Sequence, residues 1–292
     1  MRINTNVSSL SAQEAATQTN RNITNSLEKL SSGLKINKAA DDASGLAIAD
    51  KLRTQVTSIN QGVSNGNSAV ALLQIADKSM AEQSTILDTI KSKLIQANTD
   101  TTSSAGRTAI AKDVTKLLDQ LNNIAKQTNY NGTALLQSGM GSAATDTVAS
   151  TGLNFQIGES TTDIISTKTI QANVSGYSLN ALKSAAAAAA NSDSTAFTKT
   201  MAASGQKAID DAITKLNGYR GDIGSTQNQV ESAIRNLTTQ ATNIKNAESI
   251  IRDVDYAAES ANYNKLNIIA QAGSYAISQA NSTQQNVLRL LQ

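Results

Sequence analysis

The feature that most limits how this chain can fold is a long series of apolar residues at steps of three and four, uninterrupted by proline. One series includes Leu46, Leu52, Ile59, Leu73, Met80, Leu87 and Leu94, and the whole chain contains no proline. This spacing puts the apolar side chains on one face of an α-helix, and no residue in the stretch forces that helix to end. We therefore predict a helix of about 50 residues, roughly 75 Å long.

Two further apolar series have the same spacing. One runs over residues 110–124, after a polar break at 98–106, and the other runs over residues 209–251. Three such helices can bury their apolar faces against one another, which predicts an elongated bundle. Gly62 and Gly66 each cost the longest helix about 1 kcal/mol relative to alanine. Either another backbone approaches the helix closely at these glycines, or the helix simply tolerates them.

The middle of the chain has a different pattern. Asn131-Gly132 is a strong signal for a tight turn, and the segments LNFQIG and DIISTKTIQANV alternate in the manner of strands. Residues 179–203 are rich in Ala, Ser and Thr, and they predict a short helix with a surface loop. The many Ser and Thr of residues 138–204 either keep an exposed region soluble or are sites of covalent modification.

The residue types that the chain lacks exclude most kinds of catalytic and metal site. It contains no Cys, His or Trp, so an ordinary zinc site, a thiolate nucleophile, a Ser-His-Asp triad and a disulfide are all excluded. The pairs Asp41-Asp42 and Asp210-Asp211 remain as acid–base candidates. Adjacent carboxylates point in different directions on a helix, and more often they cap it. We predict no enzyme, no catalytic or metal-binding residue and no cofactor.

Charge and hydropathy also limit the partners. A net charge of +2 and an aromatic content of 3% do not suit nucleic-acid binding. The first twenty residues have no apolar core of a signal peptide, and the longest apolar run, 185–190, is far too short to cross a bilayer. We expect neither nucleic acid nor a membrane as partner. The protein is then either cytoplasmic or exported without a cleaved signal.

Both ends of the chain carry helical stripes with little charge. After Glu259 there is no acidic residue, and only Lys265 and Arg289 are basic. A solvated helix normally carries more charge, so these ends are predicted to pack against each other and against neighbouring copies. The alternative is that the termini are frayed. Both descriptions apply if the ends are frayed in the monomer and become ordered only on assembly. The apolar residues assigned to self-assembly are Ile3, Val7, Leu10, Leu27, Leu30, Leu34, Ile268, Ile269, Val287, Leu288, Leu290 and Leu291.

Several strings near the two ends resemble bacterial flagellin. They are INTN at 3–6, LEKLSSGLKIN at 27–37, ADDASGLAIADKLR at 40–53, DVDYAAESAN at 253–262 and QNVLRLL at 285–291. Their order and their places at opposite ends make the resemblance highly specific. It covers both ends and most of the helical middle.

The resemblance implies an inner coiled-coil domain built from both chain ends, joined to a helical rod domain with a β-hairpin region. Asp41 and Asp42 would lie at the spoke between these domains, and we count them with the self-assembly residues. The expected fold class is mainly α, an elongated antiparallel helical bundle with a terminal coiled coil and a small β-hairpin region in the middle. The corresponding segments are 1–44 and 253–292 for the inner domain, 45–138 and 205–252 for the rod, and 139–204 for the hairpin and variable surface region.

The implied function is structural: copies self-assemble into the extracellular flagellar filament used for swimming. The alternative is a hook–filament junction protein, a minor flagellar component with similar ends. Expected partners are other copies, a flagellin export chaperone, the flagellar cap and hook-junction proteins, and the type III export apparatus, which needs no cleaved signal peptide. The expected chaperone-binding residues are Val254, Tyr256, Ala261, Leu266 and Ile269.

A further expectation concerns host recognition. Some flagellins present an Arg, a Leu and a Glu on a rod helix to an animal toll-like receptor. Aligned without gaps, these positions are Thr89, Lys93 and Asp113 here. Loss of the Arg removes bidentate hydrogen bonding, and an ammonium group replaces an apolar contact. We therefore predict weak recognition by host innate receptors.

Overall fold

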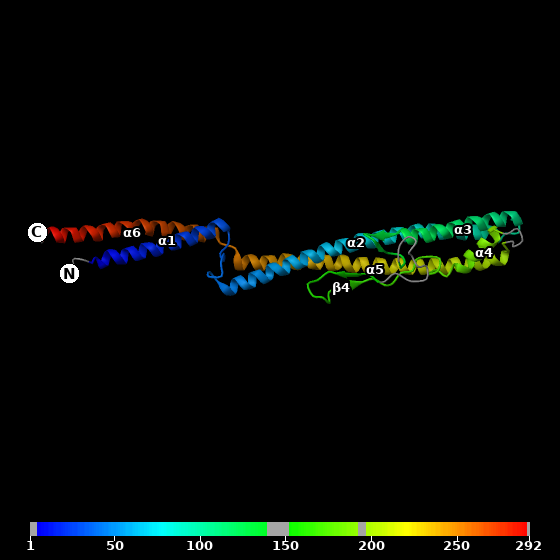
Figure 1. Cartoon of the computed structure of the whole chain (residues 1–292), viewed down its shortest axis with the longest axis horizontal. Coiled ribbons are helices and arrows are strands. Elements are labelled where there is room, and N and C mark those ends of the chain that lie inside the picture. Colours follow the sequence, from blue (N-terminus) through cyan, green and yellow to red (C-terminus); the bar gives the residue numbers. More distant parts are fainter. Residues whose placement is uncertain (1–4, 139–151, 192–196, 291–292) are drawn as a thin grey trace. The chain divides into compact units, whose positions relative to one another are not determined.

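The computed structural model describes residues 5–138, 152–191 and 197–290 (Figure 1), without the side chains of residues 191, 284 and 286–290. The fold is mainly α, as predicted. The chain divides into two compact units: unit 1 comprises residues 1–57 and 240–292, and unit 2 comprises residues 58–239. The helices are α1 (Val7–Ser32), α2 (Ala43–Ala97), α3 (Ser104–Gln127), α4 (Asn180–Asn191), α5 (Lys199–Arg252) and α6 (Tyr256–Leu290).

The long helices follow the predicted periodicity. Helix α2 has 55 residues and α5 has 54, so both extend beyond the apolar series that predicted them. The chain reverses after α2, and α3 begins where the Ser103 side chain accepts a hydrogen bond from the Gly106 amide, at 3.1 Å. The short helix predicted within residues 179–203 is α4.

The apolar core of unit 2 lies between α2, α3, α4 and α5. Leu87, Ile90 and Leu94 of α2 are fully buried, as are Leu118 of α3 and Leu216 of α5. Ion pairs at the edges join the same helices, for example between Arg220 and Asp77 at 2.8 Å. The predicted bundle of three long apolar faces is therefore present in this unit.

Unit 2 also contains two small antiparallel hairpins among its described residues. The first pairs β1 (Asn129–Tyr130) with β2 (Thr133–Ala134), and the second pairs β3 (Asn154–Gln156) with β4 (Ile164–Ser166). The predicted tight turn is confirmed, because Asn131 and Gly132 both have positive φ angles, of 48° and 83°.

The strand predicted from the segment DIISTKTIQANV is wrong beyond residue 166. Residues 167–178 form no strand, although Ile170, Ala172 and Val174 are buried in the helical core. Side-chain and non-strand backbone groups satisfy this backbone: the Gln83 amide of α2 donates to the Ala172 carbonyl at 2.8 Å, and the Ala172 amide donates to the Leu136 carbonyl at 2.8 Å. The Tyr177 hydroxyl donates to Gln83 Oε1 at 2.9 Å, and burial raises the pKa of that phenol.

Different groups approach α2 at Gly62 and at Gly66. A Cβ at Gly62 would lie 1.8 Å from the carbonyl oxygen of Ile157, just after β3, so another backbone does approach α2 closely here. The Asn65 side chain fixes the same hairpin by donating to the Gln156 carbonyl at 3.0 Å. At Gly66 the neighbour is instead the side chain of Ile234 in α5.

Candidate interaction surface of the paired chain ends

In unit 1, α1 lies beside α6, so the two ends of the chain pair as predicted (Figure 1). The Asn6 side chain caps α1 by accepting from the Ser9 amide at 3.0 Å, and its amide donates to the Ala280 carbonyl of α6 at 3.2 Å. On each helix, half-buried or buried residues recur at alternating steps of three and four, which is the spacing of a coiled-coil seam. The series are Ser9, Ala12, Ala16, Thr19, Ile23, Ser26 and Leu30 on α1, and Glu259, Tyr263, Leu266, Ala270, Gly273, Ile277 and Ala280 on α6.

This seam is built largely from small and polar residues. Within the described part of α1 and α6, Ser26 is the only buried residue, and its hydroxyl donates to Glu259 Oε1. An ordinary coiled coil has Leu, Ile or Val at these positions, and burial of those side chains supplies its stability. The α1–α6 pair therefore has almost no apolar core of its own.

Several large apolar residues of these helices face away from the seam, whereas Ile23, Leu30 and Leu266 are half-buried within it. Val7 is 64% exposed, Leu10 63%, Ile268 67% and Tyr275 78%. Ile268 and Tyr275 are seven residues apart, so they share one face of α6. The pair of helices thus presents an apolar outer surface to its surroundings, which is unusual for an isolated soluble protein.

The predicted self-assembly residues differ in exposure. Leu27 and Ile269 are also exposed, whereas Leu30 and Leu34 are half-buried. Two of the predicted residues, Ile3 and Leu291, lie outside the described residues, as do the side chains of Val287, Leu288 and Leu290. In the predicted chaperone-binding segment, Tyr256 and Ala261 are exposed, and Val254 and Leu266 are half-buried.

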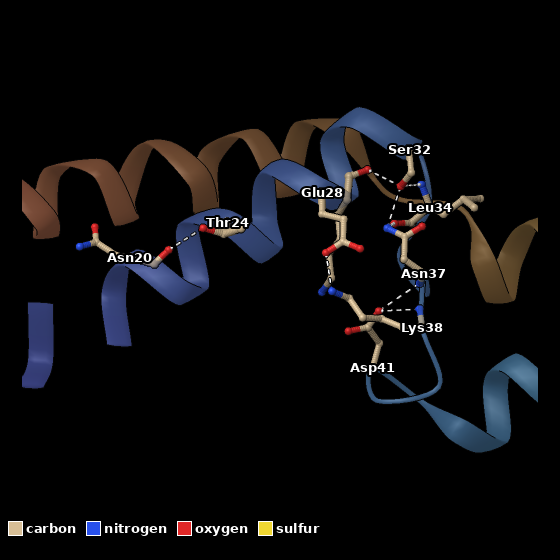
Figure 2. Close-up of polar contacts among 9 residues, drawn as sticks. Asn20, Thr24, Glu28, Ser32, Leu34, Asn37, Lys38 and Asp41 are labelled. Carbon is tan, nitrogen blue, oxygen red and sulfur yellow. Dashed lines mark hydrogen bonds and ion pairs between the residues drawn. The ribbon is translucent and has the colours of Figure 1, made fainter. Parts of the chain in front are cut away.

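The connector between α1 and α2 is held by a local network of polar contacts (Figure 2). Asp41 Oδ2 accepts hydrogen bonds from the amides of Asn37 and Lys38, at 3.0 and 3.1 Å. These bonds, the one from Lys38 first, hold the pKa of Asp41 below its usual value. Lys38 also forms an ion pair with Glu28 of α1, at 2.6 Å, and this contact raises the pKa of Lys38.

Asp42 caps the start of α2. Its Oδ1 accepts from the Gly45 amide at 2.9 Å and from the Ser44 hydroxyl at 2.8 Å, and these bonds lower its pKa. Both carboxylates of the Asp41-Asp42 pair are therefore engaged within unit 1, as a turn anchor and a helix cap. This is the role that adjacent carboxylates were expected to have in place of acid–base chemistry.

The two connectors of unit 1 are joined to each other. Leu34 and Asp253 form an isolated antiparallel bridge, flanked by a bond from the Val254 amide to the Gly33 carbonyl at 3.0 Å. Gly33 ends α1 with φ 74°, and a Cβ there would lie 3.0 Å from the Tyr256 hydroxyl. The αL conformation and this close contact both favour glycine.

The other predicted positions lie in unit 2. Lys93 of α2 pairs with Asp113 of α3 at 2.9 Å, and the Thr89 hydroxyl donates to the Thr85 carbonyl at 2.8 Å. Asp210 pairs with Lys91 at 2.5 Å. Across residues 5–138, 152–191 and 197–290 no group of three potential metal ligands occurs. In those same ranges no helix has the length and apolar character needed to span a bilayer.

The composition of the seam was not foreseen from the sequence. The signal was present as small residues such as Ala12, Ala16 and Ala270 at heptad spacing, but the larger side chains beside them dominated the apolar pattern. Spacing alone does not reveal which of two overlapping stripes faces the partner helix.

Comparisons with known proteins agree with these features. The family model for the bacterial flagellin N-terminal helical region matches residues 3–140, and that for the C-terminal helical region matches residues 206–291. The chain is 34% identical to a flagellin of Bacillus subtilis and 32% identical to a 33 kDa flagellar filament core protein of Treponema phagedenis. Each alignment covers the whole of both proteins.

Among solved structures, the fold is similar to that of a protein from Vibrio parahaemolyticus assigned to the flagellar hook-associated class. The TM-score is 0.59 at 14% identity, over 73% of this chain and 99% of that one. At this identity the likeness concerns the fold alone.

Proposed function

The chain belongs to the bacterial flagellin family, and from that premise we propose that its copies join through the outward apolar faces of α1 and α6. As a flagellin it is a structural subunit that self-assembles into the flagellar filament, outside the cell, and it is not an enzyme. A hook–filament junction protein is the less favoured alternative, because the full-length relatives described above are filament proteins.

One observation carries the proposed interface: among the described side chains of the two paired helices only Ser26 is buried, while Val7, Leu10, Ile268 and Tyr275 are exposed. Full burial of one large apolar side chain stabilises an assembly by about 1.5–3 kcal/mol. Contacts between different faces of successive copies can continue without limit, and this produces a filament in place of a closed oligomer. Neighbouring copies would supply the apolar contacts that the α1–α6 seam lacks.

The domain division and the remaining partners follow the same proposal. The inner domain would comprise 1–44 and 253–292, and the rod 45–138 and 205–252, with 139–204 as the hairpin and variable region. Before export through the type III apparatus, the sparsely charged segment from Val254 onwards would be covered by a flagellin chaperone. At the filament, the chain would contact the cap and hook-junction proteins.

A polymerisation assay tests the interface. Full-length monomer is seeded with short filaments and compared by electron microscopy with a variant that lacks residues 254–292. We expect filaments from the full chain alone. Ile268→Asp should raise the monomer concentration needed for growth at least about tenfold, because an apolar contact between copies is lost.

The matched control is Asn264→Asp, which adds the same charge one turn away at an exposed polar position of α6. It should polymerise like the unsubstituted chain. If the Ile268→Asp variant grows as well as both the Asn264→Asp variant and the unsubstituted chain, the outer face of α6 is not an interface.

Weak recognition by host receptors is a second proposal, supported by the ion pair that engages Lys93 with Asp113. A double variant, Thr89→Arg with Lys93→Leu, restores the two side chains that receptor-activating flagellins present. In a receptor reporter assay it should signal at least about tenfold more strongly than the unsubstituted chain. Potent signalling by the unsubstituted chain would refute this proposal.

A further inference from the structure

The dipeptide Asn-Gly occurs three times in the chain, at 65–66, 131–132 and 217–218. Two of these pairs lie inside the long helices α2 and α5, and the third forms the turn between β1 and β2. The carboxamide of asparagine is thermolabile in proteins. It is most reactive where glycine follows, because glycine has no side chain to shield its backbone nitrogen. The fold therefore holds one reactive dipeptide in three different settings.

In the turn, few contacts restrain the dipeptide. Asn131 and Gly132 are both exposed, and a Cβ on Gly132 would meet no atom within 4 Å. Among the residues that the structure describes, neither the Asn131 carboxamide nor the Gly132 amide makes a hydrogen bond. The hairpin pairs only two residues of β1 with two of β2. A local change of the backbone at this turn therefore breaks few interactions.

In α2 the same dipeptide is held on both sides. The Asn65 side chain donates to the Gln156 carbonyl at 3.0 Å and accepts from the Gln61 side chain at 3.0 Å. The next residue is equally enclosed, because a Cβ at Gly66 would lie 2.8 Å from the Ile234 side chain of α5. Reaction at Asn65 requires all of these contacts to be lost.

The third pair differs from the turn mainly in its backbone. Asn217 and Gly218 are exposed, and a Cβ at Gly218 would also meet no atom within 4 Å. They lie, however, in the interior of α5, where the backbone amides are bonded along the helix. The preceding residue, Leu216, is fully buried, so unfolding of α5 at this point would expose the core. Asn217 is thus a control that matches Asn131 in exposure and in the residue that follows.

We propose that Asn131 is a site of spontaneous covalent modification, at which the side chain closes onto the Gly132 nitrogen. That nitrogen gives its proton to solvent base and bonds to Asn131 Cγ, while the Cγ–Nδ2 bond breaks and ammonia leaves. The product is a five-membered succinimide. Water then adds to one of the two succinimide carbonyl carbons and breaks the bond from that carbon to the Gly132 nitrogen. Addition at Cγ gives aspartate, and addition at the main-chain carbon gives isoaspartate.

The two products affect the hairpin differently. Asn131 has a φ of 48°, and aspartate tolerates this left-handed conformation, so the aspartate product keeps the turn. In isoaspartate the chain runs through Cβ and Cγ, and the extra backbone atom disrupts a turn that sets the register of β1 and β2. Both products add a negative charge. The reaction needs only water, and it does not depend on assembly of the chain into filaments.

Incubation of the full-length monomer in mildly alkaline buffer tests the proposal. Peptide mass spectrometry measures replacement of the amide NH2 by OH at each asparagine, and a protease specific for aspartate separates the two products. We expect Asn131 to convert at least about tenfold faster than Asn65 and Asn217, because the helical sites react only while locally unfolded. Both aspartate and isoaspartate should appear at position 131.

The matched experiment uses the same chain unfolded in denaturant, where the three asparagines should convert at similar rates because glycine follows each of them. If Asn131 converts no faster than Asn217 in the folded chain, the proposal is overturned. It is also overturned if the preference for Asn131 is as large in the unfolded chain, since the turn would then not be the cause. Neither result bears on the filament function.

Discussion

At the scale of single residues, Gly62 has a structural role that its helical position alone would not indicate. Replacement by alanine normally stabilises a helix interior by about 1 kcal/mol. Here the added Cβ would lie 1.8 Å from a backbone oxygen that no side-chain rotation can move. Overpacking of this kind costs about 1–3 kcal/mol. After the helix gain is subtracted, we expect Gly62→Ala to lower the free energy of unfolding by up to about 2 kcal/mol, measured by denaturant titration.

Gly218 in α5 provides the matched control. It is exposed, and a Cβ there would meet no atom within 4 Å. Gly218→Ala should raise the free energy of unfolding by about 0.5–1 kcal/mol. If Gly62→Ala raises the free energy of unfolding as Gly218→Ala does, the close approach at Gly62 does not affect stability.

The connector at Asp41 should depend on pH. Its pKa is lowered in the folded chain below the ordinary 3.8, chiefly by the hydrogen bonds from Lys38 and Asn37. The carboxylate therefore stabilises the connector above pH 3.8, and this contribution is lost as the pH falls through the lowered pKa. We expect the amide resonances of Asn37 and Lys38 to shift in that range in an NMR titration. Asp41→Asn keeps an acceptor oxygen but cannot titrate, so its amides should show no such shift.

The sequence allowed some of these residue roles to be predicted and not others. The Asn131-Gly132 turn was predictable because positive φ angles favour those residue types. At Gly62 two alternatives stayed open, because its neighbour Ile157 lies 95 positions along the chain. Contacts between distant segments leave no local pattern, so only the fold reveals them.

At the scale of elements, apolar spacing predicted α2 and α5 well, because their stripes face a core within the chain. The same reasoning found helices at the chain ends but not their seam. There large apolar side chains such as Ile268 and Tyr275 face outwards, and Ala16 lies opposite Gly273 between α1 and α6. The direction of an apolar stripe shows where burial is favourable, and that place can lie in another copy.

This arrangement predicts a difference in local stability between helices. The monomer in dilute solution should exchange the amide hydrogens of α1 and α6 at least about a hundredfold faster than those of residues 72–94 in α2. The reason is that α1 and α6 bury little, whereas α2 contributes fully buried residues such as Leu87 and Leu94. Hydrogen-exchange mass spectrometry measures both sets in one sample. Equal protection would show that the α1–α6 pair is stable without neighbours.

At the scale of the whole molecule, the main apolar core is confined to unit 2. Its buried members extend from Leu72 to Ile223, and none belongs to α1 or α6. A variant that lacks residues 254–292 should therefore keep the cooperative unfolding of unit 2, with a melting temperature within about 2 °C of the full chain. Calorimetry measures this. A fall of more than about 5 °C would mean that the chain ends support the core.

The exposure of Tyr275 has a practical consequence. The chain has six tyrosines and no tryptophan, so its near-ultraviolet spectrum comes from a few phenol rings. Tyr177 is fully buried in unit 2, whereas Tyr275 is 78% exposed on the outer face of α6. At the interface that we propose, another copy would cover that face, and the phenol of Tyr275 would pass from water to an apolar environment while that of Tyr177 would not. On that proposal, the near-ultraviolet signal of Tyr275 reports association of the subunit without an added dye, and the signal of Tyr177 serves as the reference.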